Sequence, residues 1–135
     1  MTTSFSPLRG VGAGVVDYRL ARRGLISEVR KGRMSTTEVC DAHPELLRAA
    51  TSYSRPTSDL CPICEAVELV HVTYVFGPQL PACGRCVATL EELVRLAERS
   101  AGSVTAPTCY VVEVCVECRW NHLVQVFPLA GRRRA

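Results

Sequence analysis

The chain has 135 residues, of which 47% are hydrophobic, and a formal net charge of +3. A chain of this length is typical of one domain that buries roughly two-thirds of its unfolded surface, so the composition excludes a disordered protein. No apolar run approaches the ~18 residues of a membrane span and no signal-peptide cleavage site is present, so we expect a cytoplasmic protein. Basic side chains gather at the two ends, whereas residues 34–131 are net acidic.

The N-terminal part is predicted to be mostly helical. Apolar side chains recur at helical spacing between positions 15 and 29, which indicates one amphipathic helix. Ser35 and Glu38 form a capping box that opens a second, short helix, and Pro44 suits the first turn of a third. The two short helices resemble a helix-turn-helix in outline. Neither offers a row of base-reading side chains, so we interpret them as a helical hairpin.

After the helices the pattern is that of strands around one inserted helix. The polar stretch 51–59 is predicted to be a linker, and a strand is expected over 67–76. Its buried face would carry Val70, Val72, Tyr74 and Phe76, and its other face Leu69, His71 and Thr73. Thr89 is the expected N-cap of a helix over about 90–99, because a glutamate follows it at capping-box spacing.

Cysteines are the strongest chemical signal, because six of the eight form Cys-x-x-Cys pairs: Cys61/Cys64, Cys83/Cys86 and Cys115/Cys118. In a reducing compartment this spacing favours a metal site over disulfides. The first pair precedes a predicted strand, and the last lies between apolar runs at 110–114 and 123–127. Two such knuckles are the parts of a zinc ribbon, in which four thiolates bind Zn²⁺. We therefore predict that the metal ligands are Cys61, Cys64, Cys115 and Cys118.

The expected fold class is α+β, with an N-terminal helical segment packed on a four-cysteine zinc ribbon. This ribbon is a small antiparallel β-sheet whose two halves are separated by an inserted helix. The expected organisation is a flexible N-terminus (1–14), a helical segment (15–52), a zinc-ribbon-like domain (60–129) with the helix insertion at about 88–100, and a basic tail (130–135).

A rival pairing joins Cys61/Cys64 with Cys83/Cys86, as in a treble clef. That arrangement needs the second pair in the first turn of a helix, whereas the cap at Thr89 leaves it in a loop, which favours the ribbon. The other candidate side chains have ordinary interpretations. Cys40 and Cys109 are expected to be small buried apolar residues, His43, His71 and His122 partners of backbone or solvent, and Trp120 a packing residue beside the second knuckle.

Several segments carry a family resemblance, and together they span most of the chain: residues 16–18, 38–42, 46–50, 61–64, 74–77, 112–115 and 118–123. In these segments the chain resembles a group of small uncharacterised proteins of mycobacteria, streptomycetes and other actinobacteria. The Trp-Asn-His-Leu ending at 120–123 is the most specific part. The resemblance implies that the first and last cysteine pairs are kept and that Cys83/Cys86 has no counterpart, which agrees with the ribbon pairing. It implies no activity.

Three functions are open at this stage. The first is a non-enzymatic zinc module that binds a macromolecule in transcription or translation, with a protein partner such as a polymerase or ribosome component at least as favoured as nucleic acid. The second is a thiol redox protein that uses Cys83 and Cys86. The third is a purely structural zinc protein. No common catalytic or small-molecule signature occurs, so we expect no enzyme activity.

Overall fold

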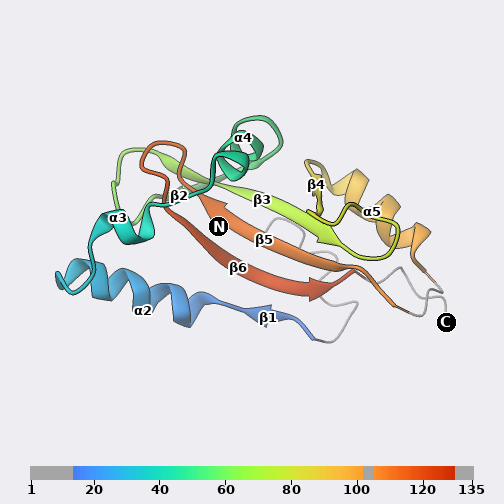
Figure 1. Cartoon of the computed structure of the whole chain (residues 1–135), viewed down its shortest axis with the longest axis horizontal. Helices are drawn as coiled ribbons and strands as arrows, with labels where there is room; N and C mark the ends of the chain where they lie inside the picture. Colours follow the sequence, from blue (N-terminus) through green and yellow to red (C-terminus); the bar gives the residue numbers. More distant parts are fainter. Residues whose placement is uncertain (1–13, 102–104, 130–135) are drawn as a thin grey trace.

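An antiparallel sheet of six strands carries the fold in the computed structural model, which describes residues 14–101 and 105–129 (Figure 1). The strands are β1 (Val16–Asp17), β2 (Arg55–Leu60), β3 (Glu68–Phe76), β4 (Arg85–Val87), β5 (Thr108–Val114) and β6 (Asn121–Pro128). The helices are α2 (Arg19–Arg30), α3 (Thr36–Val39), α4 (Pro44–Ser52) and α5 (Leu90–Arg99). The expected mixture of helices and antiparallel sheet is therefore confirmed.

The sheet order is β1-β6-β5-β3-β2, and β4 also pairs with β3. The long strands β3, β5 and β6 form the continuous centre, and the short strands β2 and β4 cover the two ends of the same edge of β3. The pairing of β5 with β6 shifts register between Val111 and Val112, which leaves Val124 as one extra residue in β6. An extra residue of this kind is a β-bulge, which bends the strand and turns its side chains.

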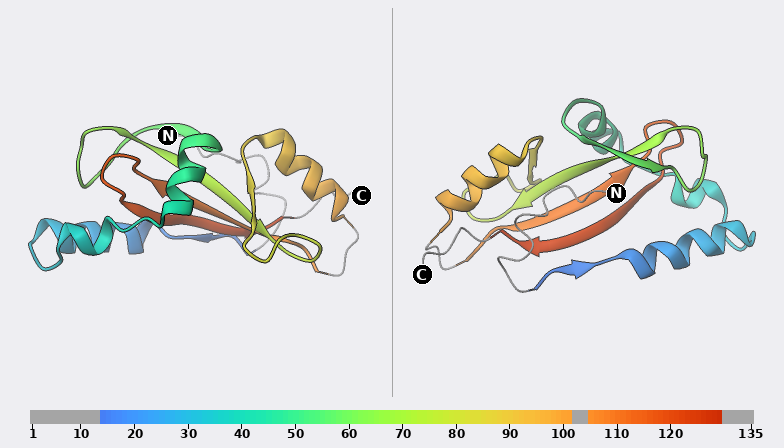
Figure 2. Two further views of the ribbon diagram at one scale, coloured as in Figure 1. Left: turned by 45° about the horizontal axis from the view of Figure 1, so that its top comes forward. Right: turned by 180° about the vertical axis from the view of Figure 1, so that it is seen from behind.

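Helices cover both faces of the sheet, at different ends (Figure 2). Helix α5 packs its Leu93, Leu96 and Ala97 on the far end of the sheet, in a core with residues such as Val75 and Phe127. Helix α4 packs Ala49 and Ala50 on Val72 and Val114. Helices α2 and α3 lie at the end where β3 begins and β5 turns into β6. The central strands are thus covered on both sides.

The helix predictions are largely confirmed. The capping box of Ser35 and Glu38 opens α3, His43 and Pro44 begin α4, and Thr89 caps α5 through the backbone N–H of Glu92. The first helix begins at Arg19, later than predicted, because the residues before it pair with β6 as β1. Of the flexible N-terminus expected at 1–14, all but Gly14 lies outside the described residues, as does the tail at 130–135.

The predicted linker at 51–59 is wrong. Helix α4 continues to Ser52, and Arg55–Leu60 forms the edge strand β2, in which Pro56 pairs with Val70. A proline is tolerated there because an edge strand has one side without ladder hydrogen bonds. The polar composition of this stretch therefore reflects an exposed edge strand.

The predicted buried face of β3 is wrong in part: Val72 is fully buried as expected, but the other three residues of that face are not. The side chains of Leu69, His71, Thr73 and Val75 are more deeply buried than those of Val70, Tyr74 and Phe76. Because β3 is central and helices lie on both faces, alternation along the strand no longer separates core from solvent. None of the helices among the described residues is long and apolar enough to cross a membrane.

Candidate metal centre

Two tight turns at one end of the sheet present the first and last cysteine pairs. In the first turn, the backbone N–H of Glu65 donates to the carbonyl of Cys61 at 3.1 Å. In the second, the N–H of Arg119 donates to the carbonyl of Cys115 at 2.9 Å. The residue that ends each turn is left-handed, with φ of 54° at Glu65 and 77° at Arg119. The two knuckles therefore share one backbone design.

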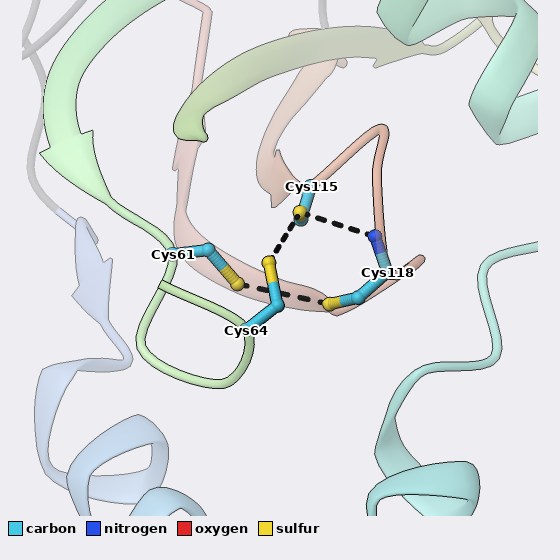
Figure 3. Close-up of side chains that lie close together, drawn as sticks. All are labelled: Cys61, Cys64, Cys115 and Cys118. Carbon is cyan, nitrogen blue, oxygen red and sulfur yellow. Dashed lines mark hydrogen bonds between the residues drawn. The ribbon is translucent and has the colours of Figure 1, made fainter. Parts of the chain in front are cut away.

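The two knuckles point their sulfurs at one another (Figure 3). The Sγ atoms of Cys61, Cys64, Cys115 and Cys118 all lie within 4.8 Å of one another. Across the knuckles, Cys64 Sγ lies 3.6 Å from Cys115 Sγ, and Cys61 Sγ lies 3.8 Å from Cys118 Sγ. Four thiols this close together are positioned to hold a metal ion.

Backbone amides within each knuckle also point at sulfur. The N–H of Ile63 donates to Cys61 Sγ at 3.4 Å, and the N–H of Cys118 donates to Cys115 Sγ at 3.3 Å. Such donors favour the thiolate form, which is the form that binds metal. Each knuckle therefore has a backbone donor to its first cysteine, from the second residue after Cys61 and from the third residue after Cys115.

Burial and the close packing of the thiols oppose the ionisation of two of them. Burial raises the pKa of Cys115, and burial together with its thiol neighbours raises the pKa of Cys118. Burial acts in the same direction on Cys64, but hydrogen bonds from the Ala66 backbone and from neighbouring thiols outweigh it and lower the pKa of Cys64. The Cys64 sulfur thus accepts hydrogen bonds from the neighbouring thiols. A bound cation would remove this competition, because it stabilises every thiolate that it contacts.

A small apolar core supports the cluster. Cys61 and Cys115 are fully buried, in contact with a group that includes Ile26 of α2, Val39 of α3 and Trp120. Trp120, which follows the second knuckle, therefore packs in the core as predicted from the sequence. Because this core joins both helices to both knuckles, the position of the helices depends on the cluster.

A buried carboxylate ties the same parts together. Glu113 of β5 accepts hydrogen bonds at one oxygen from Trp120 Nε1 and from Arg22 Nε, both at 2.7 Å. The ion pair with Arg22 links α2 to the sheet, and Glu113 is almost completely buried. No sequence pattern indicated that Glu113 is buried and paired, because Arg22 lies 91 residues away in the chain.

The third pair, Cys83/Cys86, lies apart from the cluster. Cys83 is exposed and Cys86 is half-buried in β4, where burial raises its pKa. Gly84 between them has a φ of +89°, and a side chain there would collide with the ring of Phe76. The pair lines one wall of a groove of about 820 Å³ between α4 and β4. The motif continues into a strand, and α5 begins only at Leu90.

The remaining candidates have the ordinary positions that were expected, with one exception. Burial raises the pKa of Cys109 to about 12, so this thiol is an inert core residue. His43 caps α4, and the ring of His122 stacks on Trp120 at 5.8 Å. The exception is Cys40, whose Sγ lies only 3.5 Å from Cys118 Sγ. Its isolated place in the sequence carried no signal for this contact.

The fold and the site define the chain as an α+β protein whose antiparallel sheet carries a cluster of four cysteines at one end. The chain belongs to a family of unknown function, DUF5318, which matches residues 11–135. The expected membership of an uncharacterised actinobacterial family is thereby confirmed.

Its curated relatives come from mycobacteria. The uncharacterized proteins Rv0049 and MT0055 of two Mycobacterium tuberculosis strains and Mb0050 of Mycobacterium bovis are each 45% identical to this chain over 120 residues. Each match covers 89% of this chain and 85% of the relative. No solved structure matches the chain.

Proposed function

We propose that the chain is a non-enzymatic zinc-ribbon module in which Cys61, Cys64, Cys115 and Cys118 bind one Zn²⁺. Four thiolates at about 2.3 Å from a tetrahedral zinc lie about 3.8 Å from one another. The sulfur separations of 3.6 Å and 3.8 Å between the knuckles support this geometry. Four protein ligands leave no open position for water or substrate, so the ion would contribute folding free energy rather than catalysis.

The surroundings of the cluster suit the charge of such a site. A zinc ion with four thiolates carries a net charge of −2, which nearby donors and cations stabilise. Arg30 of α2 donates to the carbonyl of Pro62 in the first knuckle at 3.3 Å. Arg119 in the second knuckle donates to the carbonyl of Ala42 at 3.1 Å. A guanidinium group is thus held beside each knuckle by a carbonyl.

Metal analysis of the purified full chain tests this part of the proposal. The expected result is one zinc per chain, lost in the double variant Cys115→Ser/Cys118→Ser and retained in the matched double variant Cys83→Ser/Cys86→Ser. Both variants remove two thiols at Cys-x-x-Cys spacing, so they differ only in position. Loss of zinc in the second variant with retention in the first would refute the ribbon pairing.

We further propose that the module binds a protein partner through the outer face of α2. Leu20 is 77% exposed, the highest fraction among the exposed large apolar side chains of the described residues, and Arg23 is exposed one turn further along the helix. Part of the flanking positive charge is offset within the chain, because Arg19 pairs with Asp17 and Arg33 with Glu28. An exposed apolar side chain among partly paired charges favours a protein surface over a polyanion.

The setting in transcription or translation rests on analogy with other zinc ribbons, because a fold does not by itself define a partner. Capture of partners from lysate at rising salt tests whether the partner is a protein or a nucleic acid. A protein partner would be retained as salt increases, and Leu20→Asp would abolish its capture without changing the zinc content. Capture that disappears steeply with salt and after nuclease treatment, in the wild type as in the variant, would favour nucleic acid.

A thiol redox function for Cys83 and Cys86 has weaker support. The thioredoxin-type setting places the motif at the start of a helix, which lowers the pKa of the attacking thiol. Here the motif leads into β4, and burial raises the pKa of Cys86. We expect no insulin reduction by the wild type above that of Cys83→Ser, and turnover that depends on Cys83 would reverse this conclusion.

A further inference from the structure

A fifth thiol lies against the four-cysteine cluster. The distance of 3.5 Å between Cys40 Sγ and Cys118 Sγ is shorter than the 3.6 Å and 3.8 Å between knuckle sulfurs. Among the described residues, the group of mutually close metal-ligating atoms contains four cysteines and does not include Cys40. A tetrahedral ion accepts four sulfurs, so Cys40 is a neighbour of the site rather than a ligand.

The position of Cys40 is built by specific contacts. It is the C-cap residue of α3, and its N–H donates to the carbonyl of Thr36. Ala42, two residues further on, is bound to the second knuckle. The N–H of Ala42 donates to the carbonyl of Arg119 at 3.0 Å, and Arg119 returns a hydrogen bond to the carbonyl of Ala42. These reciprocal bonds hold the Cys40 backbone beside Cys118.

Cys118 also differs from the other cluster thiols. Cys61 and Cys115 are fully buried, whereas Cys118 and Cys64 are partly exposed, so a small solute reaches only these two from solvent. Cys118 has a hydrogen-bonded thiol neighbour outside the ligand set, Cys40, whereas the thiols hydrogen-bonded to Cys64 belong to the cluster. A reactive thiol with a resolving cysteine beside it is the usual arrangement of a thiol that responds to oxidants.

We propose that Cys118 and Cys40 form an oxidation site for hydroperoxides, at which disulfide formation releases the metal. The Cys118 thiolate, which a bound zinc would keep deprotonated, attacks the terminal oxygen of a hydroperoxide, the O–O bond breaks, an alcohol or water leaves, and a sulfenic acid forms on Cys118. The Cys40 sulfur then attacks the Cys118 sulfur, an S–S bond forms and water leaves. In total, two thiols and one hydroperoxide give a disulfide, an alcohol or water, and one water.

The geometry makes the second step short. A disulfide has an S–S length of about 2.05 Å, so the two sulfurs need to approach by about 1.5 Å from their present separation. The product removes one of the four ligands, and three thiolates hold zinc less tightly than four. Since Val39, Cys40 and both knuckles share one small core, the oxidised pair would also disturb the packing of α2 and α3.

Treatment of the zinc-loaded full chain with hydrogen peroxide tests this proposal, which rests on the proposed zinc site. Released zinc is followed with a chromogenic chelator, and cysteine pairing is mapped by mass spectrometry without reduction. We expect one zinc released per chain together with a Cys40–Cys118 disulfide. Dithiothreitol and fresh zinc should then restore the original zinc content.

The variant Cys40→Ser separates resolution from ligation. It should bind one zinc at rest, form no disulfide at Cys118, and recover less than about half of its zinc after reduction, because an unresolved sulfenic acid proceeds to irreversible sulfinic acid. Cys83→Ser, which removes an exposed thiol away from the cluster, should behave as the wild type. A disulfide between Cys115 and Cys118, or full recovery in Cys40→Ser, would overturn the proposal.

A metal-free preparation distinguishes the two proposals. If the chain as purified holds no zinc, the proposed function fails, and the same peroxide experiment on that chain still reports which thiols pair. Formation of the Cys40–Cys118 disulfide there would support the oxidation site alone. Preferential pairing of Cys118 with Cys61 would reject it.

Discussion

The two ends of the sheet each carry Cys-x-x-Cys chemistry beside a helix, yet only one end gathers its sulfurs. At the knuckle end, two pairs converge from the β2–β3 and β5–β6 turns. At the other end, Cys83/Cys86 leads into β4, and α5 packs there on a core of ordinary apolar residues. The spacing of cysteines is equal at both ends, so the local backbone decides whether a site forms.

The backbone difference lies at the residue after the second cysteine. Glu65 and Arg119 occupy that place in the knuckles and are left-handed, which closes each turn and aims both sulfurs the same way. In the third motif the corresponding residue is Val87, a fully buried member of β4. β-branched residues strongly disfavour the left-handed region, whereas Val87 fits a strand well. A knuckle therefore needs a fifth residue as well as two cysteines.

Removal of the proposed metal ion is expected to have the largest effect, because it should destabilise the knuckle end of the sheet and not the α5 end. The knuckle end has few apolar contacts besides those around the cluster, so chelation should cost at least about 5 kcal/mol of unfolding free energy. Hydrogen exchange should accelerate in α2, α3 and both knuckles before it accelerates in α5. Uniform exchange after chelation, or an unchanged melting temperature, would contradict a structural role for the ion.

A truncation at the opposite end should have the next largest effect. Leu93 of α5 is completely buried against the sheet, so Leu93→Ala should lower the unfolding free energy by about 2–5 kcal/mol. The metal content of the variant should stay that of the wild type, because the cluster has its own core. Denaturant unfolding and metal analysis of the same sample check both parts. Loss of metal in Leu93→Ala would show that the two ends are coupled.

Loss of the buried carboxylate of Glu113 should have the third largest effect on the unfolding free energy. Glu113→Gln leaves Arg22 without its anionic partner and turns one acceptor into a donor, which should cost about 1–3 kcal/mol. Glu117→Gln is the matched control, because Glu117 is an exposed residue of the second knuckle and its loss should change stability little. Equal unfolding free energies for the two variants would mean that the Arg22–Glu113–Trp120 network contributes nothing.

The smallest effect concerns the turn residue itself. Glu65 is exposed with a φ of 54°, so Glu65→Gly should relieve strain and raise stability by up to about 1 kcal/mol while the metal is retained. Ala66→Gly is the control next to it, at a position without positive φ, and should be neutral or slightly destabilising. The opposite order of the two variants in thermal unfolding would argue against the left-handed turn as the deciding feature.

Sequence patterns were informative where the signal is local. The capping signals at Ser35 and Thr89 and the apolar run at 67–76 predict the positions of α3, α5 and β3 within a few residues. The first and last cysteine pairs stand out because predicted strands flank them. Signals that depend on distant partners were not visible. The edge strand β2, the buried pair of Arg22 and Glu113, and the contact of Cys40 with Cys118 all arise from segments that meet only in three dimensions.

The single extra residue Val124 changes which side of the sheet the odd-numbered and even-numbered side chains of β6 face. Side chains alternate along a strand, so positions 122 and 125 would ordinarily project to opposite sides. The bulge instead pairs His122 with Glu113 and Gln125 with Val111, and these four then share a side. A deep mutational scan of the strand should therefore show the tolerated order of polar and apolar residues inverting at this position. Deletion of Val124 should restore regular alternation and leave the remaining side chains on their present sides, because Leu123 and Gln125 would then oppose Val112 and Val111 as consecutive residues.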